Sequence, residues 1–486
     1  MPADPRRGEA DHPSTGADAR HAGHGSGDMA MPGHQTGGHA MPAQAPGAMP
    51  EHDAAMQHGL ATPWAHFFAA IILGIWLITS PASLDYRDTA LVWSDIVSGA
   101  LIIAFATVTL VRRSAWAPWA NALVGVWLLF APLVFWAPTA ASFANDTLAG
   151  ALVIAFVLLM PGMPGMRMLP GPDVPPGWSY NPSTWPQRAP IIALALLGFL
   201  LSRQMAAYQL GHTDAVWEPF FDPGTRAVLD SDVSKMFPIS DGGFGAVAYA
   251  VEALMGFMGD RQRWRSMPWM VRFFGILVVP LGMVSITLII LQPVAVGEWC
   301  TPCLIAALAM LIMIALTLDE VVAMGIFLVR AAREGQSVWR VFWLGGTLTE
   351  APMESGSGGH PDVISAKAMI WGVALPWNLL VAAALGLWLM AAPSIVDSGG
   401  NAAHSDHLVG ALVVSFAIMA WADVGRALRF VNILLGAWIA VAPWLLDGAT
   451  TGAVVSDLVV GIALILLSLP RGPVGERYGT WDRYIR

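Results

Sequence analysis

The chain of 486 residues is 56% hydrophobic and only 12% charged, with a mean hydropathy of +0.58. Soluble domains carry about a quarter charged residues, so this composition excludes a soluble globular protein and predicts many membrane spans. The formal net charge of −9 and the absence of a basic stripe argue against a nucleic-acid partner. Continuous apolar runs of about 17–25 residues predict an all-α polytopic membrane protein in contact with lipid, not a barrel.

Residues 1–62 precede the first apolar run and are rich in Gly, Pro, Ala, Met and His. They contain no apolar core of the kind found in a cleavable signal peptide, and their composition predicts a disordered cytoplasmic tail. Imidazole and thioether groups are good copper ligands, which makes weak copper binding by this tail one hypothesis. The irregular spacing specifies no ordered site and favours a plain disordered tail.

A repeated motif flanks the middle of the chain. The pattern G-x-W-x4-P occurs four times, and each copy is followed 13 or 14 residues after its proline by D-x-x-x-G. The tryptophans of the four copies are Trp76, Trp127, Trp388 and Trp438, and the aspartates are Asp95, Asp146, Asp406 and Asp457. Constant spacing of this kind predicts one transmembrane helical hairpin per copy, so residues 63–162 and 366–470 each hold four spans.

Each part of this motif has a physical interpretation. The glycines let the two helices of a hairpin approach closely, and the tryptophan lies near the membrane interface. The aspartate is expected at the start of the returning helix, where it caps free backbone N–H groups. A proton or ion pathway is the alternative for these carboxylates. The paired repeats resemble the SPW-repeat family, which implies no particular chemistry.

Residues 187–334 form a different block with four further apolar runs, which brings the expected total to about twelve spans. It is flanked by a Pro- and Trp-rich linker at 163–186 and a second linker at 335–365, and the chain ends in a cytoplasmic tail at 471–486. Basic residues fall in alternate loops, so the positive-inside rule predicts that both termini are cytoplasmic. These residues are Arg112, Arg113, Arg167, Arg188, Arg261, Arg263, Arg265, Arg330, Arg333, Arg426, Arg429 and Arg471.

The only two cysteines, Cys300 and Cys303, form a C-x-x-C motif at the head of the last apolar run of this block. A helix N-terminus lowers the pKa of a cysteine, and the thiolate is the reactive form, so the motif favours redox chemistry. We expect Cys300 to be the more nucleophilic and more exposed member, and Cys303 to face a buried ligand. A structural disulfide would stabilise little across so short a loop, and a metal site would lack further ligands nearby in sequence.

The segment 228–256, followed two spans later by C-x-x-C, resembles the vitamin K epoxide reductase family. Val228, Leu229 and Ser231 match the family's V-[LF]-x-S turn, and Gly245 and Tyr249 match its G-x-x-x-Y. The resemblance implies a central four-helix bundle around a quinone, with Cys300 and Cys303 as the redox pair. It further implies that Asp241, Ser231 and Tyr249 lie at the quinone, and Trp299 is expected to form a stacking wall.

This chain departs from the family pattern in the loop after the first span of the block. Typical members carry two further cysteines there, whereas this sequence has Thr225 at one position and the stretch around Trp217 at the other. It also lacks the thioredoxin-like domain fused to many bacterial members. Electrons must therefore come to Cys300 directly from an external thiol or a thioredoxin-like protein.

The sequence thus predicts a thiol–disulfide/quinone oxidoreductase of this type in the bacterial inner (plasma) membrane. Its cofactor would be ubiquinone or menaquinone, and its C-x-x-C would face the outer side. Two alternatives stay open: a multi-span transport or copper-handling protein, and a structural membrane protein with a vestigial quinone site.

Overall fold

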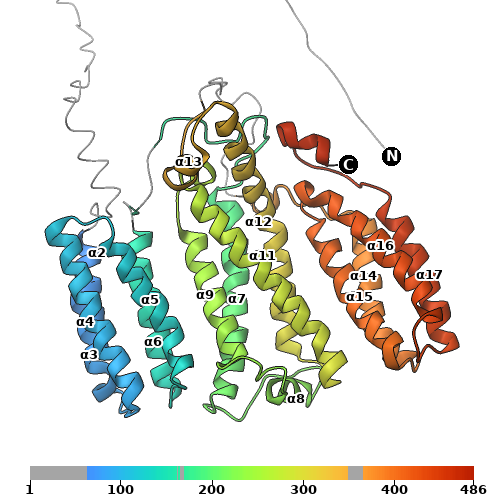
Figure 1. The fold of residues 1–486 in the computed structure, drawn as a ribbon, viewed down its shortest axis with the longest axis horizontal. Helices are drawn as coiled ribbons and strands as arrows, with labels where there is room; N and C mark the ends of the chain where they lie inside the picture. The colour runs from blue at the N-terminus through green and yellow to red at the C-terminus, as the bar shows by residue number, and fades with distance from the viewer. Residues whose placement is uncertain (1–62, 161–162, 165–168, 349–364, 486) are drawn as a thin grey trace, which may run out of the picture. The chain divides into compact units, whose positions relative to one another are not determined.

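The computed structural model describes residues 63–160, 163–164, 169–348 and 365–485, so the predicted N-terminal tail lies outside the described residues. The described residues form helices and contain no strand beyond two isolated β-bridges. Eleven helices in this part of the chain are long and apolar enough to cross a membrane. The prediction of an all-α polytopic fold is confirmed (Figure 1).

The first four spans come in two hairpins, coloured blue to blue-green in Figure 1. The spans are α2–η1–α3 (Pro63–Ser83), α4 (Thr89–Arg112), α5 (Ala117–Val134) and α6–η2 (Ala140–Leu159). The last four spans repeat the arrangement. They are α14 (Trp377–Ile395), α15 (Gly400–Met419), η5–α16–η6 (Asp423–Trp444) and α17 (Thr451–Ser468).

Four helices lie between the two sets. They are α7 (Trp185–Gln209), α9 (Asp241–Phe257), α11 with η3 (Pro268–Val296) and α12 (Thr301–Arg333). At 17 residues, α9 is about 25 Å long and is the shortest of the four, which is why it is not among the eleven. It packs along α7 in the place of the expected second core span. The short helices α8 (Gly224–Asp230) and α13 (Val338–Leu344) lie at opposite ends of this group (Figure 1).

The glycines of the repeated motif meet each other inside every hairpin. A Cβ atom added to any of them would come within 2.5 to 3.0 Å of the carbonyl oxygen of its partner glycine. The pairs are Gly74 with Gly99, Gly125 with Gly150, Gly386 with Gly410, and Gly436 with Gly461. The predicted close approach of the two helices is therefore confirmed, and no larger residue fits these positions without moving the backbone.

The prediction that the aspartates cap the returning helices is wrong. Those helices begin at Thr89, Ala140, Gly400 and Thr451, and the motif aspartates lie six residues further on in each case. All four side chains are at most 1% exposed. The carboxyl groups of Asp95 and Asp146 lie close enough to interact, and so do those of Asp406 and Asp457. The aspartates thus join the two hairpins of a pair. Each lies about one and a half helical turns after the start of its own helix.

The motif tryptophans make the same connection. Each indole N–H donates to the residue that precedes the aspartate of the other hairpin, at 2.7 to 3.0 Å. The acceptors are Asn145 for Trp76, Ser94 for Trp127, Ser456 for Trp388 and Ser405 for Trp438. The rings themselves are 40–45% exposed on the outside of the helices, where a membrane interface accommodates them.

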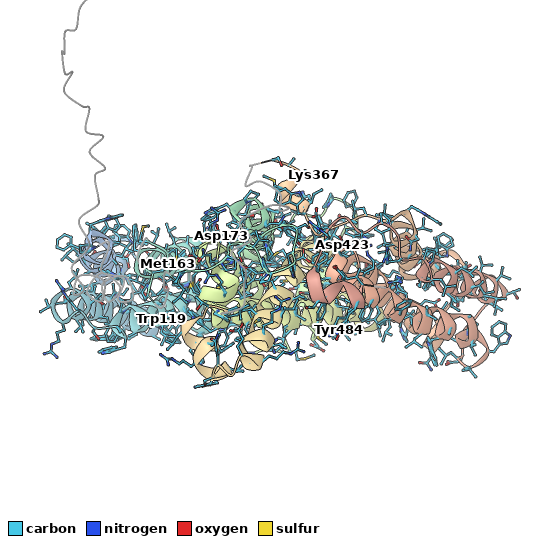
Figure 2. The ribbon with its side chains drawn as sticks, turned by 90° about the horizontal axis from the view of Figure 1, so that it is seen from above. Trp119, Met163, Asp173, Lys367, Asp423 and Tyr484 are labelled. Carbon is cyan, nitrogen blue, oxygen red and sulfur yellow. A yellow bond between two sulfur atoms is a disulfide. The ribbon has the colours of Figure 1, made fainter. Side chains whose placement is uncertain are left out.

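The end of the molecule that carries α13 is more ordered than the expected linker and tail imply. Trp178 of the first linker pairs through its backbone with Tyr478 of the C-terminal segment, and both side chains are buried in one hydrophobic cluster. Figure 2 looks onto this end, with Asp173 and Asp423 labelled. Residues 169–184 and 471–485 therefore pack against the helices and are not free connectors.

Several arginines of the positive-inside pattern are buried at this end. Arg263 binds Glu320 through two nitrogens, each 2.6 Å from a carboxylate oxygen, and both side chains are nearly inaccessible. Arg188 donates to the carbonyl oxygens of Gly256, Met258 and Gly259 at the end of α9. The guanidinium groups thus donate hydrogen bonds to backbone carbonyl oxygens and to a buried carboxylate. A buried arginine needs such partners to offset the cost of removing its charge from water.

Candidate functional site

The C-x-x-C motif begins α12, the longest helix in the described part of the chain. Cys300 is the N-cap of α12, and its sulfur accepts a hydrogen bond from the backbone N–H of Cys303 at 3.3 Å. The two sulfurs are joined as a disulfide. Gly297, with φ of +79°, makes the turn from η3 into α12. Just before that turn, Gln292 Oε1 accepts from the backbone N–H of Cys300 at 3.0 Å and fixes the start of the helix.

The two cysteines differ in exposure, but not as the sequence predicts. Cys300 is fully buried, whereas Cys303 is half-buried. Cys300 belongs to a small apolar cluster with Met205 of α7 and with Val228 and Leu229 of α8. Because α8 and the loop before it cover Cys300, the expectation that Cys300 is the exposed member is wrong.

Cys303 opens into a pocket of about 110 Å³ between α7, α9, α11 and α12. Asp241 and Tyr249 line the same pocket, so the structure brings three of the six expected site residues together. The remaining lining is mostly apolar, with a few polar groups. Apolar residues include Met205, Leu229, Leu288 and Ile289, and polar ones include Ser202, Ser234 and Gln292.

Two of these side chains are held by neighbouring helices. Asp241 Oδ1 accepts from the backbone N–H of Gly242 at 2.7 Å and from Gln209 Nε2 of α7. Tyr249 donates its hydroxyl proton to the carbonyl oxygen of Ala306 on α12, at 2.7 Å. A Cβ atom at Gly198 would meet the Tyr249 ring at 2.5 Å, so the glycine makes room for the ring.

Ser231 and Trp299 lie outside this pocket. The Ser231 hydroxyl donates to the carbonyl oxygen of Val228 at 2.7 Å, which closes the end of α8. The Trp299 ring meets His407 of α15 edge to face, with ring centroids 5.8 Å apart. Trp299 therefore packs against the C-terminal repeats. The pocket is lined by Ser234, three residues after Ser231, and not by Ser231 itself.

Gln292 and Gln209 are site residues that sequence reasoning missed. Gln292 lines the pocket while its oxygen binds the Cys300 backbone, which leaves its two amide N–H donors for a ligand. Gln209 holds Asp241 and also donates to Ser234 Oγ at 2.8 Å. Each is a single polar residue at the end of an apolar run, and that position was the available signal.

A second cavity, of about 390 Å³, adjoins the first and shares Leu229 and Ser234 with it. Trp136, from the loop after α5, lines this outer cavity. His212 Nε2 lies 2.7 Å from the carbonyl oxygen of Ala137 in the same loop. The N-terminal repeats thus contact the loop that covers the disulfide, as the C-terminal repeats contact Trp299.

Within the described ranges, no group of three or more His, Cys, Asp or Glu side chains is placed to hold a metal ion. The Met- and His-rich segment considered for copper binding lies outside those ranges.

Comparison with known families agrees with the division of the chain into a central four-helix block and two flanking sets of repeats. Residues 189–318 match the model of the Vitamin K epoxide reductase family, and residues 64–160 and 376–470 match the SPW repeat domain. No curated protein and no solved structure matches the chain significantly. The chain therefore contains a vitamin K epoxide reductase family domain between two SPW repeat domains. At the level of the family, this domain is a membrane thiol–disulfide oxidoreductase.

Proposed function

We propose that the vitamin K epoxide reductase family domain, residues 189–318, transfers electrons from an external thiol to a membrane quinone through Cys300 and Cys303. The observation that carries this proposal is the disulfide at the start of α12, with Cys303 in the same pocket as Asp241 and Tyr249.

The reaction balances with one disulfide and one quinone. An external thiolate attacks the Cys300 sulfur, the bond to Cys303 breaks, and Cys303 leaves as a thiolate. A second thiolate attacks the partner's sulfur in this mixed disulfide, Cys300 leaves as a thiolate, and the oxidised partner is released. The reduced pair then gives two electrons to the quinone, which takes up two protons to become the quinol, and the Cys300–Cys303 bond forms again. Two thiols and one quinone are thereby converted into one disulfide and one quinol.

The start of α12 supports the assignment of roles to the two cysteines. Cys300 lies at the N-cap, where the helix dipole and the Cys303 N–H stabilise a negative sulfur. Cys303 is the sulfur that faces the pocket, so it is the one that meets the quinone ring.

The lining of the pocket supports a quinone as the ligand. A quinone ring is flat and apolar, and it has carbonyl oxygens that accept hydrogen bonds at its edge. Gln292 has free N–H donors, and Ser202 has a hydroxyl in the pocket. An ionised carboxylate only accepts hydrogen bonds, so Asp241 can bind a quinone carbonyl only in its protonated form. Bound quinol, which carries O–H groups, is the better partner for ionised Asp241.

The distribution of charge supports an orientation with the disulfide on the outer side of a bacterial inner membrane. The arginines of α10 (Arg263–Ser266) and the residues after α13 meet at one end of the central helices, where Gly346 donates to the Arg265 carbonyl oxygen at 3.1 Å. The disulfide and α8 lie at the other end. The positive-inside rule assigns the arginine end, and hence both termini, to the cytoplasm.

Quinol formation by the purified full-length protein tests the proposal. With dithiothreitol as the thiol and a short-chain ubiquinone or menaquinone analogue as acceptor, we expect Cys300→Ser and Cys303→Ser each to lower the rate by at least about 100-fold, because either change removes the disulfide. Thr317→Val, which alters α12 away from the pocket, is the matched control and should keep the wild-type rate. Equal rates in all four proteins would refute the proposal.

A further inference from the structure

Glu218 connects the loop before α8 to the start of the disulfide-bearing helix. One carboxylate oxygen accepts from the hydroxyl of Thr225 and from its backbone N–H, the latter at 2.9 Å. The other oxygen accepts from the hydroxyl of Thr301, the residue that follows Cys300, and from the backbone N–H of Phe221 at 3.0 Å. Both oxygens are thus engaged, and they connect Thr225 to Thr301, which lies 83 positions after Glu218 in the chain.

This connection holds the loop and α8 over Cys300. A Cβ atom at Gly224, the first residue of α8, would overlap the carbonyl oxygen of Trp299. The backbone of α8 therefore touches the backbone next to Cys300, whose exposed fraction is zero. An external thiol has no access to the Cys300 sulfur in this arrangement.

We propose that Glu218 is a positioning residue that latches residues 218–230 over Cys300, and that an external thiol reaches Cys300 only when this latch opens. The inference rests on the proposed function. In the closed form the disulfide presents Cys303 alone, and only to the quinone pocket. In the open form Cys300 accepts the incoming thiolate, Cys303 leaves as the thiolate, and the electrons then follow the sequence given above.

Glu218 and Thr225 lie at or near the positions where the family resemblance leads one to expect loop cysteines. Thr225 occupies one of the positions at which typical relatives have a loop cysteine, and Glu218 follows Trp217, near the other. Glu218 accepts a hydrogen bond from Thr301 at the start of α12, and Thr225 donates to Glu218 in turn. The loop is thus held by contacts that can break without any change of oxidation state.

The charge of Glu218 is well suited to holding the loop closed. Burial raises the pKa of this carboxyl, but hydrogen bonds from Thr225, Thr301 and the amides of Phe221 and Phe220 outweigh burial and lower the pKa to about 2. Because the pKa is depressed, the stabilising effect is complete above the ordinary value of 4.5 and is lost as the pH falls towards 2. The latch therefore stays charged throughout the neutral range.

Alkylation of the reduced full-length protein tests the latch. The protein is reduced, treated with N-ethylmaleimide, and the labelling rates of Cys300 and Cys303 are followed separately by peptide mass spectrometry. We expect Glu218→Gln to speed labelling of Cys300 by about tenfold or more, because charge-assisted hydrogen bonds that hold the closed form are lost. Thr301→Val, which removes a donor on the helix side, should act in the same direction. Labelling of Cys303 should not change.

Asp232→Asn is the matched control, since Asp232 is an exposed acid just after α8, outside residues 218–230, and this variant should label as wild type. In steady-state kinetics, Glu218→Gln should change the KM for dithiothreitol and leave the KM for the quinone analogue unchanged, a split that a merely unfolded variant would not give. Unchanged labelling of Cys300, or an equal rise at Cys303, would overturn the latch. Failure of the proposed function itself would appear separately, as a rate that does not depend on Cys300.

Discussion

At the scale of single residues, Cys300 and Cys303 lie one helical turn apart but meet different surroundings. Cys300 is enclosed by apolar groups of α7 and α8, and Gln292 holds its backbone. Cys303 borders the pocket, with its sulfur 3.5 Å from Met205 Sδ. Cys300 is therefore shielded from an external thiol while Cys303 faces the pocket, an arrangement that would separate the two proposed half-reactions in space.

Asp241 gives a prediction at this scale. In Asp241→Ala the pocket loses the carboxyl, and Gln209 loses an acceptor. If protonated Asp241 donates to the quinone carbonyl, the KM for the quinone analogue should rise about tenfold, which corresponds to roughly 1.4 kcal/mol, the value of one good hydrogen bond. The KM for dithiothreitol should stay the same, because the thiol reacts on the Cys300 side.

Steady-state kinetics with each substrate varied in turn measures both constants. Asp232→Asn serves again as the control acid outside the pocket. An unchanged quinone KM in Asp241→Ala would remove this residue from the quinone site.

At the scale of elements, the SPW hairpins are joined by a pair of buried carboxyl groups. An ionised carboxylate is only an acceptor, so a hydrogen bond between the neighbouring carboxyls of Asp406 and Asp457 would need one of the two to carry a proton. Both side chains are 1% exposed, which makes the shared proton the least costly arrangement in an apolar bundle. The same reasoning applies to Asp95 and Asp146.

Substitution of Asp457 tests this interpretation. The amide of Asp457→Asn can donate to Asp406 and should keep the free energy of unfolding within about 1 kcal/mol of wild type, whereas Asp457→Ala should lower it by about 1–3 kcal/mol. The difference arises because alanine leaves the Asp406 carboxyl buried without its partner. Thermal unfolding in detergent micelles measures both variants, and equal stability of the two would contradict a shared hydrogen bond.

The sequence predicted features that repeat or that lie close together in the chain. The hairpins, their glycine contacts and the dithiol at a helix start all follow from local spacing, and the structure agrees with them. The role of the aspartates was misjudged because their partners are about 50 residues away, in another hairpin. Glu218 was missed for the same reason, since its contact with Thr301 spans 83 residues, whereas Gln292 was missed although Cys300 is only eight residues further along the chain.

At the scale of the whole molecule, α12 connects two polar regions. Its 33 residues are about 50 Å long, which exceeds the roughly 30 Å thickness of the hydrocarbon core of a membrane. The disulfide begins the helix, and Asp319 and Glu320 lie further along it, bound to Tyr180 and Arg263. The disulfide and the buried charges near the other end therefore share one continuous helix.

The presence of only two cysteines sets the electron capacity of the protein. A single dithiol stores one electron pair, so the molecule cannot accept a second pair from thiols before the first has left for the quinone. Oxidation of the thiol and reduction of the quinone must then alternate, which is a ping-pong mechanism. Initial rates measured at several fixed quinone concentrations should give parallel lines in a double-reciprocal plot, whereas intersecting lines would indicate that both substrates bind before either reacts.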